Sequence, residues 1–370
     1  MLSYIGSLYS DTPLRLLASY LVLLSIGSMV SAVLVWLFLP RLWKFLPRDR
    51  GKALVKDGVV SEGKPTGAGL IVSLFTLPGL LLAVPVEGSC QMAIVGLYAI
   101  MLCGFLDDRA SVPWGELRKG VLDAACCIMC AFAMYLDGMN DIWLPLTKHV
   151  FHLPVWVYIP MASFVLFISV NALNCSDGVD GLAGSLGIMS LLALTGLLYL
   201  VLGYKPVADY LLLPHYAGGA RWAVLSATIA GGFASYLWYN AEPSQVLMGD
   251  AGSRMLGLAI GIAVLAAGNP LLIFVFAPVI FADGGTGLVK VLLLRLFKKL
   301  GFDITPPSKL TPEKAAEQNI VVRSFHSIRF PLHDHCRYVK NWSRPQILIR
   351  FVIMQAFLIP LLFAIFTKVR

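Results

Sequence analysis

Three short motifs in the sequence gather acidic side chains of the kind that bind cations beside phosphate groups. The motifs are GFLDD (104–108) with Asp107 and Asp108, NALNCSDGVDG (171–181) with Asp177 and Asp180, and MGDAGS (248–253) with Asp250. Carboxylates gathered in one place repel one another unless a cation or a basic partner joins them. We expect Mg²⁺, because it is typically held by one or two carboxylates together with substrate phosphate oxygens. For each motif taken alone, a simple cap at a helix end is the alternative.

A fourth motif, FPLHDHCR (330–337), alternates His333, Asp334 and His335. Two histidines that flank an acid supply neither the ligand number nor the helical spacing of known zinc sites. Beside a carboxylate cluster, these side chains are better interpreted as groups that hold a phosphate. A surface loop without function is the simpler alternative.

Three basic residues and one acid within an apolar run complete the candidates. Lys64 in KPTGAG, Arg118 and Lys119 are suited to neutralising phosphate charge, although each also fits the ordinary excess of cations on one side of a membrane. Asp283 lies in FADGGTGLVK, and ionisable residues inside a membrane are usually functional. The glycines beside Asp283 indicate a broken or bent helix at the edge of the same site.

The elements that must position these residues are membrane-spanning helices. Of the 370 residues, 58 % are hydrophobic and only 14 % are charged, with a mean hydropathy of +0.78. This composition predicts an all-α polytopic membrane protein, since apolar runs of about twenty residues recur along the chain. We expect about ten transmembrane helices in a single domain, 1–370. The predicted spans are 14–40, 68–86, 90–106, 119–137, 154–173, 182–202, 220–238, 254–267, 270–296 and 347–366.

Lysine and arginine predict the orientation of these helices. Most of them fall on one side, including a dense set from Arg295 to Arg350, and that side should be cytoplasmic. The four motifs and KPTGAG fall on the same side, so we expect a cytoplasmic-face cleft in a multi-pass plasma-membrane protein. The long loop 298–345 would carry the HDH motif. The net charge of +8 suits anionic membrane lipids or an anionic substrate, and no nucleic-acid partner is expected.

These motifs resemble a known family. NALNCSDGVDGLAG is similar to the NxxNxxDGxDGLA signature of the polyprenyl-phosphate N-acetylhexosamine-1-phosphate transferases, and GFLDD and MGDAGS resemble the family's other acidic motifs. The tail PLHDHCRYVKNWSRPQILIRF most resembles the branch that transfers phospho-N-acetylmuramoyl-pentapeptide. The similarity covers nearly the whole chain.

The resemblance implies transfer of phospho-MurNAc-pentapeptide from UDP-MurNAc-pentapeptide to undecaprenyl phosphate, which gives lipid I and UMP in peptidoglycan synthesis. It implies Mg²⁺ as the cofactor, Asp250 as its ligand, a catalytic role for His333, and Asp107 and Asp108 as an essential pair near the lipid phosphate. It places Asp177 and Asp180 on the nucleotide side. Members of this family are often dimers, although the sequence shows no interface signal for a homodimer. The residues expected to bind substrate are Lys64, Thr66, Arg118, Lys119, Asn171, Asn174, Asp177, Asp180, Asn240, Asp334 and His335.

Several departures from the family pattern leave the sugar open. Asp334 stands where the family has a histidine, Arg337 where it has a glutamate, and Ser111 where it has a lysine. A transferase of GlcNAc-1-phosphate from UDP-GlcNAc to polyprenyl phosphate is therefore the alternative within the family. A secondary transporter is the alternative outside it, although transporters place such acids near the midplane and the sequence shows no inverted repeat.

Overall fold

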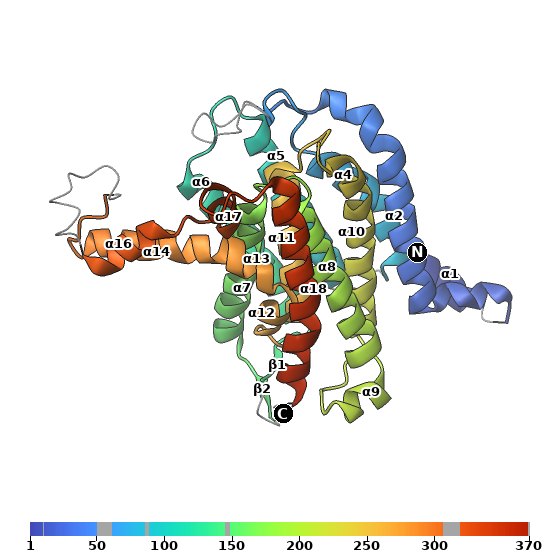
Figure 1. The fold of residues 1–370 in the computed structure, drawn as a ribbon. Helices are drawn as coiled ribbons and strands as arrows, with labels where there is room; N and C mark the ends of the chain where they lie inside the picture. Colours follow the sequence, from blue (N-terminus) through green and yellow to red (C-terminus); the bar gives the residue numbers. More distant parts are fainter. Residues whose placement is uncertain (10, 50–60, 86–88, 145–148, 306–318, 369–370) are drawn as a thin grey trace.

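The structure, a computed structural model, describes residues 1–9, 11–49, 61–85, 89–144, 149–305 and 319–368. Long helices run side by side through most of the chain (Figure 1). Part of the predicted loop 298–345 (residues 306–318) lies outside the described residues, as do the predicted cytoplasmic cations Arg50, Lys52 and Lys56.

Helix α11 (Gly249–Ala266) is the centre of the bundle, because almost all of its side chains are buried. Its many glycines and alanines let neighbouring helices pack closely, as is common between helices in membranes. The helices packed against α11 are α4 (Gly69–Ala83), α5 (Ser89–Arg109), α6 (Glu116–Leu136), α7 (Val155–Ser176), α8 (Leu182–Gly196) and α10 (Gly219–Asn240).

The outer helices turn large apolar side chains outward. Helix α2 (Tyr20–Leu42) exposes Trp36, α6 exposes Ile128, and α18 (Arg344–Lys368) exposes Phe357. Apolar side chains on the outside of a helical bundle are expected where lipid rather than water surrounds the protein.

Seven helices in the described part of the chain are long and apolar enough to cross a membrane. They confirm a polytopic helical membrane protein, but they do not confirm the predicted count of ten. The predicted span 68–86 is the shorter helix α4, with 15 residues. The predicted span 220–238 is α10, whose polar and small residues place it outside the seven.

The predicted span 270–296 is broken into four pieces. They are α12 (Leu272–Phe276), α13 (Pro278–Ile280), the π-helical turn η4 (Phe281–Gly285) and α14 (Thr286–Lys299). Pro278 cannot donate a backbone hydrogen bond, and Gly284 and Gly285 follow Asp283 in the π-turn. Helix α14 then leaves the bundle, with α16 (Ile320–Ser327) beside it (Figure 1). The break that the glycines indicated is therefore present, and it separates α14 from the bundle.

Shorter elements connect or flank these helices. They are α1 (Leu2–Leu8), η1 (Pro13–Ala18), η2 (Trp43–Phe45), the antiparallel pair β1 (Asp141–Trp143) and β2 (Val150–His152), η3 (Leu197–Leu202), α9 (Lys205–Tyr210) and α17 (Leu332–Tyr338). Helix α17 carries the HDH motif and packs against α18 and η4.

Candidate active site

The three acidic motifs meet at one end of the bundle. Asp107 and Asp108 lie in the last turn of α5, and Asp250 lies in the first turn of α11. A Cβ on Gly104 would lie 2.4 Å from the carbonyl oxygen of Asp250, so only glycine lets α5 approach α11 this closely. Gly249 has a φ of +70°, which suits glycine at the start of α11. The expected convergence of GFLDD and MGDAGS therefore depends on a glycine in each motif.

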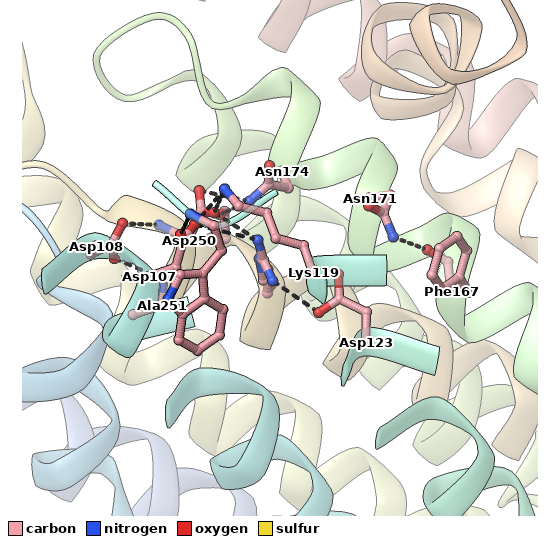
Figure 2. A network of polar contacts seen from close by, with 12 residues as sticks. Asp107, Asp108, Lys119, Asp123, Phe167, Asn171, Asn174, Asp250 and Ala251 are labelled. Carbon is pink, nitrogen blue, oxygen red and sulfur yellow. Dashed lines mark hydrogen bonds and ion pairs between the residues drawn. The ribbon is translucent and has the colours of Figure 1, made fainter. Parts of the chain in front are cut away.

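The Asp250 carboxylate is surrounded by donors (Figure 2). Its Oδ2 pairs with Arg254 Nη2 at 2.7 Å and with Lys119 Nζ at 3.3 Å. Its Oδ1 accepts a hydrogen bond from Asn174 Nδ2 at 3.2 Å, and the same amide donates to Ser253 Oγ at 3.0 Å. Three sequence-predicted residues (Lys119, Asn174 and Asp250) are thus in direct contact.

The two members of the aspartate pair have different surroundings. Asp107 is buried, pairs with Lys119, and accepts a hydrogen bond from the Trp114 backbone N–H at 2.8 Å. Asp108 accepts hydrogen bonds from the backbone N–H groups of Asp250 and Ala251, at 3.0 and 3.1 Å. Asp108 therefore caps the start of α11 and fixes Asp250, while Asp107 holds Lys119.

The cluster includes a buried ion pair that our sequence reasoning missed. Arg254 Nη1 lies 3.0 Å from Asp123 Oδ1, and the exposed fractions of the two side chains are 4 % and 2 %. The sequence contained signals for both residues. Arg254 follows Asp250 by four positions on one helix, where opposite charges pair, and Asp123 is an acid within an apolar helix.

A pocket of about 460 Å³ opens beside this cluster. It is lined by nine of the predicted residues: Thr66, Asp108, Asn174, Asp177, Asp180, Asn240, Asp250, His333 and Asp334. Arg337 and Arg344 line the same pocket. Sequence motifs from α5, α7, α11 and α17 therefore share one cavity.

One wall of the pocket is the loop after α7. Asn240 Oδ1 accepts a hydrogen bond from Gly181 N at 2.7 Å, and its Nδ2 donates to the Val246 carbonyl at 2.8 Å. Lys64 Nζ donates to Ser244 Oγ at 2.9 Å and lies 3.7 Å from Asp180 Oδ2. Asn240 thus connects the DGVDG loop to the segment before α11, and Lys64 neutralises part of the charge of this wall.

His333 is oriented by a buried aspartate. Asp283 is fully buried, and its carboxylate accepts hydrogen bonds from the His333 backbone N–H at 2.8 Å and from Nδ1 at 2.9 Å. The other ring nitrogen, Nε2, faces Gly178, where a Cβ would lie 2.2 Å away. Burial alone would lower the pKa of His333, but the Asp283 carboxylate outweighs it, and the pKa is raised. Asp283 therefore contacts a residue that lines the pocket but does not line the pocket itself, and its place at the edge of the site stays a prediction.

Three predicted residues point elsewhere. Arg118 lies over the Trp114 ring, 3.7 Å from its centroid. Asn171 donates to the Phe167 carbonyl within α7, apart from the cluster in Figure 2. His335 Nδ1 accepts a hydrogen bond from Arg329 N at 3.3 Å. No pocket-lining contact supports a substrate role for these three among the described residues, and their roles stay predictions.

An apolar groove of about 750 Å³ runs beside the cluster on the outer face of α6 and α7. Leu117, Val121, Ile128, Phe164 and Phe167 line it, and the ion pair of Glu116 with Arg295 borders it. Glu116 and Gly120 of this groove flank Lys119 along α6. The groove and the acidic cluster are therefore joined by one helix.

The donor set of the cluster suits a hard cation. Asp107, Asp108, Asp123 and Asp250 bring four carboxylates, against the two cations Lys119 and Arg254. Within the described residues, no three His, Cys, Asp or Glu side chains converge into a complete metal cage. Mg²⁺ does not require one, since one or two carboxylates and substrate phosphates commonly hold it. The excess of negative charge and the oxygen donors therefore fit Mg²⁺, with Asp250 as the candidate ligand.

Comparison with known proteins agrees with this geometry. Residues 90–268, which contain the three acidic motifs, match the family model described as Glycosyl transferase family 4. The phospho-N-acetylmuramoyl-pentapeptide-transferase of Treponema pallidum is 40 % identical over 376 residues, which cover 100 % of this chain and 96 % of that protein. The protein of the same name from Gemmatimonas aurantiaca is 31 % identical, with 93 % of each chain covered. The chain therefore belongs to the family of phospho-N-acetylmuramoyl-pentapeptide-transferases.

Proposed function

We propose that the chain transfers phospho-MurNAc-pentapeptide from UDP-MurNAc-pentapeptide to undecaprenyl phosphate, which gives lipid I and UMP. The observation that carries this proposal is that Lys119 pairs with Asp107 and Asp250. Asp250 lines the polar pocket, and Lys119 belongs to the helix that lines the apolar groove. Transfer between a water-soluble nucleotide and a lipid requires these two surfaces to meet at the reacting phosphate. We place this end of the bundle on the cytoplasmic side of the plasma membrane. A homodimer stays a prediction.

The donor would occupy the polar pocket. Its uridine end would lie against the wall formed by Asp180 and Asn240, and its diphosphate near Asp250 and Asn174. Asp250 would hold Mg²⁺, which when bound supplies positive charge that stabilises UMP as it leaves. Phosphoryl transfer depends chiefly on such positioning and charge neutralisation. His333 lines the pocket and would hold a phosphate oxygen through Nε2.

The acceptor would lie with its polyprenyl chain in the apolar groove on α6. A phosphate at the end of this chain would reach Lys119, which lies between the groove residues Leu117 and Gly120 along the helix and is 27 % exposed. Asp108 lines the pocket, so we assign to it, rather than to Asp107, the carboxylate that orients or deprotonates this phosphate. The acceptor oxygen then attacks the β-phosphorus, and the bond from that phosphorus to the oxygen of UMP breaks. A direct attack inverts the configuration at phosphorus, whereas a covalent aspartyl-phosphate route retains it.

The test is UMP release by the purified protein. We expect release from UDP-MurNAc-pentapeptide only when undecaprenyl phosphate and Mg²⁺ are both present. The parallel reaction with UDP-GlcNAc should release little UMP. Release from UDP-GlcNAc but not from UDP-MurNAc-pentapeptide would support the GlcNAc-1-phosphate transferase instead. Uptake of a solute into vesicles with no formation of UMP would support a transporter.

A further inference from the structure

Two neighbouring arginines that have no role in the proposed reaction line the same pocket. Arg337 is in the last turn of α17, and Arg344 is the first residue of α18. Both are half-buried, and both line the pocket that contains His333 and Asp250. They come from elements other than α5, α6 and α11, which hold the acidic cluster.

A turn with defined hydrogen bonds joins the two helices that carry these arginines. The Trp342 backbone N–H donates to the Cys336 carbonyl at 3.0 Å, and Asn341 has a φ of +54°. At the start of α18, the Ser343 N–H donates to Gln346 Oε1 at 3.0 Å, which is one half of a capping box. The chain reversal between α17 and α18 is thus fixed by backbone contacts, and the two arginines are held on either side of it.

The two guanidiniums give this side of the pocket positive charge. Arg344 is at the start of a helix, where the positive end of the helix dipole adds to this charge. Burial, followed by the nearby guanidinium of Arg344, lowers the pKa of Arg337. This side of the pocket therefore suits an anion, and paired arginines suit the planar geometry of a carboxylate.

We propose that Arg337 and Arg344 bind a carboxylate of the stem peptide of the donor, in the first instance its C-terminal carboxylate. This inference rests on the proposed function, because it takes UDP-MurNAc-pentapeptide as the donor. A pentapeptide joined to the sugar through its amino end always carries a free C-terminal carboxylate. The two phosphates of the same donor are already assigned to Asn174 and Asp250, and the acceptor phosphate to Lys119. The arginine pair therefore distinguishes donors that carry a peptide from those that carry a bare sugar.

The experiment compares two donors, UDP-MurNAc-pentapeptide and the same compound with its C-terminal carboxylate converted to an amide. In the wild type, amidation should raise KM about tenfold, a size typical of losing a charge-assisted hydrogen bond. Arg337→Gln and Arg344→Gln should each raise KM for the free acid about tenfold and change KM for the amide by less than about twofold. The KM for undecaprenyl phosphate should not change.

Arg329→Gln is the matched control. Arg329 belongs to the same basic segment and, like Arg337, lies over the Tyr338 ring, 5.2 Å from its centroid, but it does not line the pocket. It should leave both KM values at the wild-type level. Arg337→Lys, which keeps the charge, separates a binding defect from a folding defect and should recover part of the affinity.

Equal effects of the arginine substitutions on both donors would overturn the proposal and would assign the pair to the diphosphate. A raised KM for undecaprenyl phosphate would assign it to lipid phosphate instead. Direct binding of the two donors to the purified protein, measured by calorimetry, needs no turnover. It therefore tests the arginine pair even if the proposed reaction fails, whereas absence of UMP release from the wild type bears only on the proposed function.

Discussion

Two groups of buried charged side chains lie at the same end of the bundle, and they differ in how their negative charge is neutralised. Asp283 and His333 form a closed pair, with exposed side-chain fractions of 0 % and 3 %. The Asp250 cluster has more carboxylates than cations, and its Lys119 side chain is 27 % exposed. A closed pair fixes one side chain, whereas a cluster with unbalanced charge and an exposed cation can rearrange around an anionic substrate. We therefore assign chemistry to the cluster and positioning to the pair.

The strongest test of this contrast is the removal of the central carboxylate. Asp250→Ala should lower kcat/KM by at least about a thousandfold, a size typical of removing a key charge stabiliser. It also removes one of the two carboxylates that Lys119 and Arg254 share, and leaves Asp107 as the other. UMP release measures the effect. Asp209→Ala, which changes an exposed acid in the short helix α9, should retain wild-type activity. Near-normal activity of Asp250→Ala would show that Asp250 is not the ligand of Mg²⁺.

The next test compares two adjacent cations on α6. Lys119→Gln should lower kcat about a hundredfold, because Lys119 joins Asp107 to Asp250 and faces the expected acceptor phosphate. Arg118→Gln is the matched control and should stay within about twofold, since its guanidinium lies over Trp114. Equal losses in the two variants would show that general positive charge, rather than this contact, supports the reaction.

Disrupting the pair of Asp283 and His333 should have a smaller effect on kcat/KM, and that effect should depend on pH. Asp283→Asn should lower kcat/KM about tenfold to thirtyfold, because partners that orient a functional histidine typically contribute factors in this range. The Asp283 carboxylate raises the pKa of His333, and Asp334 and Asp177 contribute in the same direction. If the imidazolium holds a phosphate, activity falls as pH rises through this pKa, and the variant should lose activity at lower pH than the wild type.

The pH profile of kcat/KM, together with the profile of Asp334→Asn, checks this assignment. Asp334 lies 3.8 Å from His333 Nε2 and is 35 % exposed, so its removal should shift the profile less and in the same direction. A loss of activity in Asp283→Asn that is uniform across pH would indicate a structural role only.

The smallest effect on turnover is expected at the far end of the cluster. Asp123→Asn should change kcat by less than about threefold, because Asp123 is buried and contacts Arg254 but does not line the pocket. The free energy of unfolding should fall by about 1 to 3 kcal/mol, since a buried charged hydrogen bond is weakened. Thermal unfolding in detergent measures this change. A thousandfold loss of activity would extend the reactive cluster to Asp123.

The sequence predicted which helix ends meet, but not which side chains meet there. Apolar runs identify helices, and the acidic motifs fall at their ends, so the convergence of Asp108, Asp177 and Asp250 on one side followed from topology. Residues adjacent on a helix differ by about 100° in direction. The different surroundings of Asp107 and Asp108, and of Arg118 and Lys119, depend on neighbouring helices that no local pattern specifies.

Two features of the structure do not follow from the sequence, and the cause is the same. Arg254 is one of many cations on the expected cytoplasmic side and Asp123 lies within an apolar helix, but neither position identifies the other residue as its buried partner. The predicted count of ten crossings rests on hydropathy alone, and the seven long apolar helices among the described residues do not confirm it. Helix α4 is short, and the run 270–296 breaks at Pro278 and at the glycines after Asp283. In each case a specific ion pair or a helix-breaking residue decided the local structure, and the mean hydropathy and charge of the segment did not reveal it.

The central claim, that the cluster reacts and the closed pair positions, is tested most directly by single-turnover UMP release with donor and acceptor both saturating. Asp250→Ala and Asp283→Asn are compared side by side across pH. We expect the rate constant to fall by at least about a thousandfold in Asp250→Ala at every pH. In Asp283→Asn it should fall by no more than about thirtyfold and should recover at lower pH. Equal, pH-independent losses in both variants would contradict the account.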